Sequence, residues 1–295
     1  MPELPEVEAL VRFLDGRSSG AVVARAELAS FSVLKTFDPP LQALVGATIA
    51  GWRRRGKFLL MELSTGSGNA SADPFWLALH LARGGWVRWS DSLPVKTARP
   101  GKGPLALRMG LDGGQGFDVT EAGTEKRLAA WVVRVPEDVE AIGRLGPDPL
   151  EPGFDATTLG SLLRAHGGQL KGAMTTQSVL AGVGNAYSDE ALHLARLSPF
   201  KAADRLSDGE VERLYVALVG VLGDAVARSV GLPAAGLKDE KRSGMRVHGR
   251  TGEPCPECGD AVRQVAFASK SLQYCPTCQT GGKLLADRRL SRLLK

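Results

Sequence analysis

The spacing of apolar residues changes from a helical to a strand-like pattern near residue 20. Four apolar residues recur at the i, i+3, i+4, i+7 spacing of an amphipathic helix: Val7, Leu10, Val11 and Leu14. Pro5 suits the first turn of such a helix, and the small and polar residues from Gly16 to Gly20 are typical of its end. The sequence therefore predicts an N-terminal helix that buries one face.

Short apolar runs separated by Gly, Pro and Ser fill the next hundred or so residues. Seven of these runs are predicted to be strands: 21–28, 48–52, 58–63, 76–80, 86–89, 105–111 and 129–135. No helical pattern separates them. Consecutive strands without intervening helices indicate a β-sandwich or barrel rather than an α/β sheet.

The pattern becomes helical after a Pro- and Gly-rich linker at 136–150. Two helical segments are predicted within 170–195, and Ser207 and Glu210 form a capping-box signature for a helix that ends near Ser229. Short strand-like pieces follow Gly244. The predicted fold class is α+β with several domains: 1–135, the linker 136–150, a helical domain at 151–243, and a small C-terminal module at 244–295.

Composition narrows the class of protein. The 295 residues suffice for two cores, and the mean hydropathy is −0.06. The longest apolar stretch, at 216–222, is too short to span a membrane, and the acidic start of the chain is unlike a signal peptide. All four cysteines lie within 255–278, which suits a reducing cytoplasm. The net charge of +5 permits a polyanionic partner without requiring one.

The cysteines form two C-x2-C pairs, Cys255 with Cys258 and Cys275 with Cys278. Two such pairs at this separation match a structural zinc site with four thiolate ligands. The alternative, two disulfides, requires an oxidising compartment. Basic residues around the pairs could contact phosphates, and the alternative is a solvated basic tail.

Two segments near the N-terminus combine charge with a turn. Pro2 would present a secondary amine once Met1 is removed, and Glu3 and Glu6 beside it could move protons. The alternative is that these residues only cap a helix. A cationic turn, 53–57, then joins two predicted strands and could deliver Lys57 to a phosphate or a leaving group, or could only protect a sheet edge.

The segment from Gly182 to Asn185 precedes a predicted helix. Glycines at a helix start can expose backbone amides to an anion, although tight packing between helices explains them equally well.

Taken together, these segments resemble the formamidopyrimidine-DNA glycosylase/endonuclease VIII family of base-excision enzymes. The markers occur in the family's order over nearly the whole chain, at 2–8, 56–57, 145–150 and 181–185 and in the four cysteines. The resemblance implies an N-terminal β-sandwich, a helix-two-turn-helix domain and a C-terminal β-hairpin zinc finger. It also implies one structural Zn²⁺ ion, and a monomer that binds damaged double-stranded DNA.

The resemblance also implies a role for individual residues. Pro2 would attack the sugar C1′ as the nucleophile, Glu3 would be the catalytic acid, and Glu6 a supporting carboxylate. Lys57 would contact phosphate and act as a general acid. Lys171, Asn185 and Lys270 would bind the DNA backbone, with Lys270 standing where the family has an arginine.

The sequence departs from the family pattern where a side chain fills the space left by the extruded base. Arg83 stands where relatives of the 8-oxoguanine enzyme carry a methionine, and the segment 125–130 lacks the usual phenylalanine. The candidates for this wedge are Arg83, Lys126, Arg127 and Leu128, with Leu128 expected to fill the space. The segment 236–245 is short for a loop that covers an oxidised purine.

The sequence thus predicts a cytoplasmic repair enzyme, nucleoid-associated if bacterial. It would remove oxidised or ring-opened bases through a Schiff base at Pro2 and cleave the strand by β- and δ-elimination. One alternative is a catalytically impaired damage-binding protein of the same fold. Another is an unrelated zinc-ribbon protein that binds nucleic acid, which would not explain Pro2 and Glu3.

Overall fold

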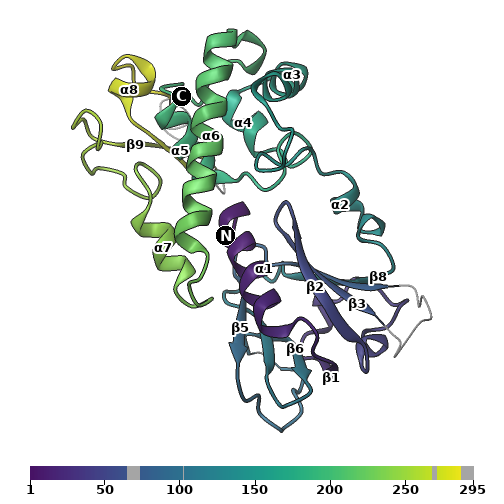
Figure 1. Ribbon diagram of the computed structural model, residues 1–295. Coiled ribbons are helices and arrows are strands. Elements are labelled where there is room, and N and C mark those ends of the chain that lie inside the picture. Colours follow the sequence, from purple (N-terminus) through teal and green to yellow (C-terminus); the bar gives the residue numbers. More distant parts are fainter. Residues whose placement is uncertain (65–73, 102, 268–270, 287–295) are drawn as a thin grey trace, which may run out of the picture. The chain divides into compact units, whose positions relative to one another are not determined.

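The computed structural model describes residues 1–64, 74–101, 103–267 and 271–286 (Figure 1). The chain forms two compact units. Unit 1 comprises Met1–Arg144 and Ser229–Lys238, and unit 2 comprises Leu145–Arg228 and Asp239–Lys295.

The predicted N-terminal helix is present as α1 (Leu4–Ser18). It opens with a capping box in which the Glu3 side chain accepts a hydrogen bond from the backbone of Glu6. In return the Glu6 Oε2 atom accepts one from the Glu3 backbone N–H at 2.8 Å. Pro5 costs no helical hydrogen bond, because the first four N–H groups of a helix have no partner within it. The apolar face of α1 is buried in unit 1.

The strands that the structure describes in unit 1 form two antiparallel sheets of four strands each, which confirms the predicted sandwich. The first sheet has the order β1 (Val23–Leu28), β6 (Leu105–Leu111), β7 (Gly116–Glu121) and β5 (Gly85–Ser90). The second has the order β2 (Thr48–Arg55), β3 (Phe58–Ser64), β4 (Phe75–His80) and β8 (Ala129–Val133).

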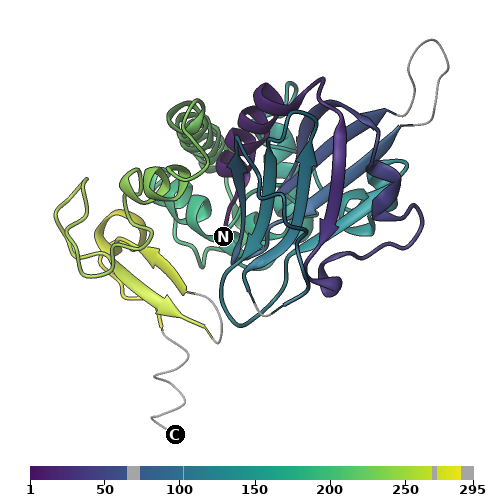
Figure 2. The same ribbon diagram turned by 90° about the horizontal axis from the view of Figure 1, so that it is seen from below.

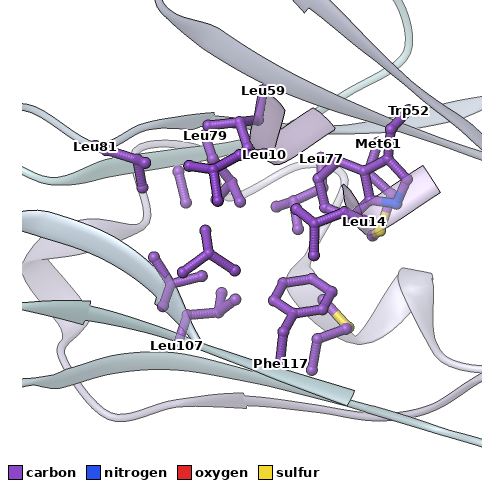
Figure 3. Close-up of a cluster of buried hydrophobic side chains, with 14 of the residues drawn as sticks. Leu10, Leu14, Trp52, Leu59, Met61, Leu77, Leu79, Leu81, Leu107 and Phe117 are labelled. Carbon is purple, nitrogen blue, oxygen red and sulfur yellow. The ribbon is translucent and has the colours of Figure 1, made fainter. Parts of the chain in front are cut away.

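One continuous core joins α1 to both sheets. Leu10 and Leu14 of α1 lie among Leu59 and Leu77 of the second sheet, and Phe117 points toward them from the first (Figure 3). Each of these five side chains is fully buried. This burial holds α1 in a fixed position on the sandwich.

Strand β7 is the one strand of the sandwich that the hydrophobic pattern does not predict. Within Gly116–Glu121 only Phe117 and Val119 are apolar. Asp118 lies opposite Arg108 on β6, and its two oxygens accept hydrogen bonds of 2.7 and 2.8 Å from that guanidinium. This bidentate cross-strand pair lets a polar segment occupy a sheet, and the pattern of one strand cannot reveal its partner.

The helices predicted for the second half of the chain are confirmed. They are α4 (Leu170–Thr175), α5 (Asn185–Leu194) and α6 (Asp208–Ser229). The predicted capping box opens α6: the Glu210 N–H donates to Ser207 Oγ at 3.3 Å, and the Ser207 N–H donates to Glu210 Oε2 at 3.0 Å. Helix α3 (Ala156–His166) precedes them and is capped by Asp155.

The remaining elements are short. Helix α2 (Glu140–Gly143) follows the sandwich, and α7 (Leu237–Ser243) follows α6. The C-terminal hairpin consists of β9 (Arg263–Ala266) and β10 (Ser271–Tyr274), drawn in yellow in Figure 2, and α8 (Pro276–Thr280) follows it.

No helix in the described ranges has both the length and the apolar composition needed to cross a membrane.

The segment Ser229–Lys238 packs with the sandwich. The Trp86 Nε1–H donates a 3.0 Å hydrogen bond to the carbonyl of Ala234, and the Lys238 ammonium lies 4.6 Å from the centre of the Trp86 ring. Ala234 and Leu237 belong to the unit 1 core. The sequence places these residues in the 151–243 domain, whereas their packing is with unit 1.

Arg196 offers a test of how α5 ends. This exposed residue has φ = 56° directly after the helix, and the Leu197 N–H reaches back to the carbonyl of Leu192 at 3.0 Å. Glycine adopts this left-handed conformation without a Cβ penalty. We expect Arg196→Gly to raise the free energy of unfolding by about 0.5–1 kcal/mol in urea denaturation. Arg196→Ala, which keeps a Cβ, should not, and an equal gain in both variants would contradict this explanation.

Candidate functional site

Two polar contacts fix the direction of α1 along strand β2. Near the end of α1, the Trp52 Nε1–H donates to Ser18 Oγ at 2.8 Å. One end of β2 is held by Glu8, whose Oε2 accepts a 2.8 Å hydrogen bond from Arg54 Nε. Ser18 contacts Trp52 and Glu8 contacts Arg54, so α1 and β2 run in opposite directions. The start of α1 therefore lies at the same end of the sheet as the turn after Arg55.

That turn presents Lys57. Strands β2 and β3 pair from Arg55 and Phe58, so Gly56 and Lys57 form a two-residue hairpin loop. Gly56 has φ = 56°, as tight hairpin turns require. Lys57 is only 7% exposed. The predicted hairpin tip is thus confirmed, but its lysine is packed into unit 1 rather than extended into solvent.

Pro2, Glu3 and Glu6 are buried at the start of α1. The capping box holds the carboxylates of Glu3 and Glu6 with backbone N–H groups. One turn further, burial alone would raise the pKa of Glu8, but hydrogen bonds from Arg54 and Arg12 hold it below its usual range. Helix capping and catalysis are therefore not exclusive interpretations, because the cap itself fixes the two acidic side chains.

His80 is a neighbour of Lys57 that the sequence does not single out as a functional residue. Strand pairing places His80 opposite Phe58, with 4.9 Å between the ring centres. Burial, reinforced by the positive charge of Lys57, lowers the pKa of His80 to about 4. Its imidazole is thus neutral at pH 7. The pairing of β3 with β4 is the signal that could have identified it.

The His80 pKa predicts how the stability of unit 1 depends on pH. The unfolded chain takes up a proton below about pH 6.5, whereas the folded protein does so only near pH 4. Stability should therefore fall as the pH decreases through this window, by up to about 3 kcal/mol. Urea unfolding at pH 7 and pH 5 should show this loss reduced in His80→Gln and unchanged in His166→Gln, which removes an exposed histidine. Equal pH dependence in wild type and His80→Gln would refute the assignment.

The four wedge candidates lie on two adjacent loops of unit 1. The Ala122 N–H donates to the carbonyl of Gly84 at 3.0 Å, so the β4–β5 and β7–β8 loops touch through their backbones. The positively charged candidates, Arg83, Lys126 and Arg127, are exposed. Leu128 is 2% exposed and belongs to the core. The expectation that Leu128 fills the space left by a base stays a prediction, and it requires this side chain to leave its packing in the core.

Lys171 and Asn185 lie together in unit 2, where they line a pocket of about 210 Å³ with Phe200, Phe267 and Leu272. The Asn185 side chain donates to the carbonyl of Ser271 at 2.7 Å. Lys270 lies outside the described residues.

The four cysteines form a compact cluster. All four Sγ atoms lie within 4.8 Å of one another, with Cys255–Cys278 at 3.9 Å and Cys258–Cys275 at 3.4 Å. All four cysteines are free, and both separations are longer than the about 2.05 Å between the sulfur atoms of a disulfide. Four sulfur atoms bound to zinc in a tetrahedron, at about 2.3 Å from the metal, lie about 3.8 Å from one another. The two observed separations are close to this value. The cluster fits a structural zinc ion with no open position.

Comparison with known protein families covers most of the chain. The N-terminal domain of formamidopyrimidine-DNA glycosylase matches residues 1–122, and the H2TH domain of that enzyme matches residues 145–233. The zinc finger found in FPG and IleRS matches residues 252–281.

Individual relatives agree with these matches. A formamidopyrimidine-DNA glycosylase of Rippkaea orientalis is 30% identical over 95% of this chain and 100% of its own. A protein of Mycobacterium tuberculosis described as an uncharacterized formamidopyrimidine-DNA glycosylase-like protein is 61% identical over 51% of this chain and 94% of its own. The solved structure of Lactococcus lactis Fpg with DNA containing an abasic site has a TM-score of 0.80 at 27% identity, covering 94% of this chain and 99% of that one.

Proposed function

Because this chain belongs to the formamidopyrimidine-DNA glycosylase family, we propose that it is a repair glycosylase and abasic-site lyase acting as a monomer on damaged double-stranded DNA. It would excise oxidised or ring-opened bases and then cleave the strand. The observation that carries this proposal is the buried start of α1. There Pro2 and Glu3 lie at the end of the sheet that bears Lys57.

Pro2 would act as the nucleophile after removal of Met1. An α-amino group has a pKa of about 7.7–8.0, so an appreciable fraction of this amine is neutral and nucleophilic at pH 7. The nitrogen lone pair forms a bond to C1′ while the damaged base departs with its bonding electrons and takes up the proton that the amine releases. A secondary amine then yields an iminium at C1′ once the sugar ring opens. The base must first leave the stack, because C1′ cannot be reached inside the duplex.

Strand cleavage follows from the acidity that the iminium gives to C2′. Loss of a C2′ proton expels the 3′ phosphate in β-elimination, and a further elimination expels the 5′ phosphate. Glu3, fixed by the capping box, would protonate the opening sugar and carry protons in these steps, with Glu6 holding the helix start. Lys57 would neutralise the phosphate and assist its departure, beside the neutral ring of His80.

Lesion choice would follow from the loops of unit 1. The wedge positions offer three exposed cations and no exposed apolar side chain, since Leu128 is buried. The segment that would cover a purine is also held in place. Ala234 and Leu237 pack in the core of unit 1, and residues 237–243 form α7. We therefore expect 8-oxoguanine to be a poor substrate, and formamidopyrimidines, oxidised pyrimidines and abasic sites to be better ones.

The experiment is a panel of end-labelled duplexes carrying 8-oxoguanine, formamidopyrimidine, thymine glycol or an abasic site. The proposal predicts excision and strand cleavage on at least the last three. Binding to every duplex without excision or cleavage would instead establish a damage-binding protein of the same fold. Efficient excision of 8-oxoguanine opposite cytosine would overturn the proposed lesion choice alone.

A further inference from the structure

A buried carboxylate on α5 joins three parts of unit 2. The side chain of Asp189 has no exposed surface. Its Oδ1 accepts a 2.6 Å hydrogen bond from Lys171 Nζ on α4. Its Oδ2 lies 2.8 Å from His248 Nδ1 and accepts a 3.2 Å hydrogen bond from the Gln273 N–H on β10. One side chain thus connects the helices to the C-terminal hairpin.

Lys171 directs its ammonium into the protein. Besides Asp189 Oδ1, the Nζ atom lies 2.8 Å from Ser188 Oγ and 2.9 Å from the carbonyl oxygen of Asn185. A lysine ammonium has three N–H donors, so these acceptors match its full capacity. A DNA phosphate could bind this ammonium only by displacing one of them, although Lys171 borders the pocket.

The same contacts hold Asn185 in place. Lys171 binds the Asn185 main chain at the start of α5, and the Asn185 side chain in turn reaches Ser271 at the start of β10. Removing either member of a buried ion pair leaves an uncompensated charge, so Lys171 and Asp189 depend on each other.

We propose that Lys171 and Asp189 form an electrically neutral positioning pair. The pair sets the start of α5, and therefore Asn185, against the hairpin, and Lys171 does not itself neutralise a DNA phosphate. This inference rests on the proposed function, because it concerns which residues meet DNA. It replaces the role that family resemblance implies for Lys171 with one that acts through Asn185.

The test uses the full-length, zinc-loaded chain and a duplex containing an abasic-site analogue. The double variant Lys171→Met/Asp189→Asn removes the pair but keeps the buried site neutral, so it is suited to folding. The slope of log affinity against log salt should equal that of wild type. Loss of a phosphate contact would reduce its magnitude by about 0.9 and overturn the proposal. The matched control is Arg164→Met/Asp208→Asn, which removes an exposed ion pair of the same unit.

A second measurement tests whether Lys171 acts through Asn185. DNA affinity is compared for wild type, Asn185→Ala, the Lys171→Met/Asp189→Asn variant and the combined variant. If the pair acts through Asn185, the combined loss of affinity should not exceed the loss from Asn185→Ala alone. A combined loss equal to the product of the separate losses would contradict the inference. Absence of any salt-dependent DNA binding by the wild type would refute the proposed function instead.

Discussion

Substitution of Pro2 by Gly is expected to lower the rate of base excision at least about a thousandfold while leaving part of the cleavage at preformed abasic sites. Glycine keeps an α-amine but makes it primary and removes the ring that holds the nitrogen against α1. Glu3→Gln should lower excision by about 10²–10⁴. Its amide oxygen can still accept the capping hydrogen bond from Glu6, so α1 should keep its start. Single-turnover excision on a formamidopyrimidine duplex measures both effects.

The control for these variants is Arg12→Ala, which alters an exposed side chain on the same helix. It should excise bases at nearly the wild-type rate, and all three variants should unfold at similar urea concentrations. Glu3→Gln should also bind the duplex no more weakly than wild type, because it removes a negative charge near phosphate. Excision by Glu3→Gln at the wild-type rate would remove Glu3 from the proposed mechanism.

The second large effect, on zinc content and DNA binding, is expected from the loss of one of the four clustered cysteines. Cys258→Ser is expected to release zinc, unfold the hairpin module and abolish tight DNA binding. For such sites the free energy of metal binding is folding free energy, about 10–16 kcal/mol in small zinc modules. The core of unit 1 contains none of the four cysteines, so the sandwich should stay folded. Metal analysis, near-ultraviolet circular dichroism and DNA titration measure these outcomes.

Thr277→Ala is the matched control within the same module. It removes a hydroxyl that donates to Asp260 at 2.9 Å but keeps all four thiolates, so zinc should remain bound. If carefully prepared wild type contains no zinc, or if Cys258→Ser retains it, the cluster does not hold the module together as described.

Local sequence patterns predict much of this fold because they reflect interactions between residues that are close together in the chain. The helix at Asp208–Ser229 is marked by its capping box and its end, and the zinc cluster by the spacing of its ligands. Strand β7 escapes this approach because Asp118 is satisfied by Arg108 on a neighbouring strand. Partners distant in sequence are also what make His80 a neighbour of Lys57 and bury Leu128 in the core.

The residues of the candidate site likewise divide into those that local patterns predict and those that they do not. Pro2, Glu3 and Lys57 are marked by residue type and by turn chemistry, and the direction of α1 along β2 places them at one end of the sheet. The resemblance instead implies that Lys171 binds the DNA backbone. Its buried partner, Asp189, lies 18 residues further on, and no local pattern connects the two. Charge that is compensated across a fold cannot be recognised from residue type alone.

The measurement that bears most directly on the central claim is borohydride trapping with an abasic or lesion duplex. It compares protein whose mass shows loss of Met1 with protein that retains Met1. If Pro2 is the nucleophile, reduction of the iminium should join the processed protein covalently to DNA and give a slower-migrating band. Protein that retains Met1 should give none. Trapping that persists undiminished with Met1 in place would assign the nucleophile to another amine and contradict the mechanism.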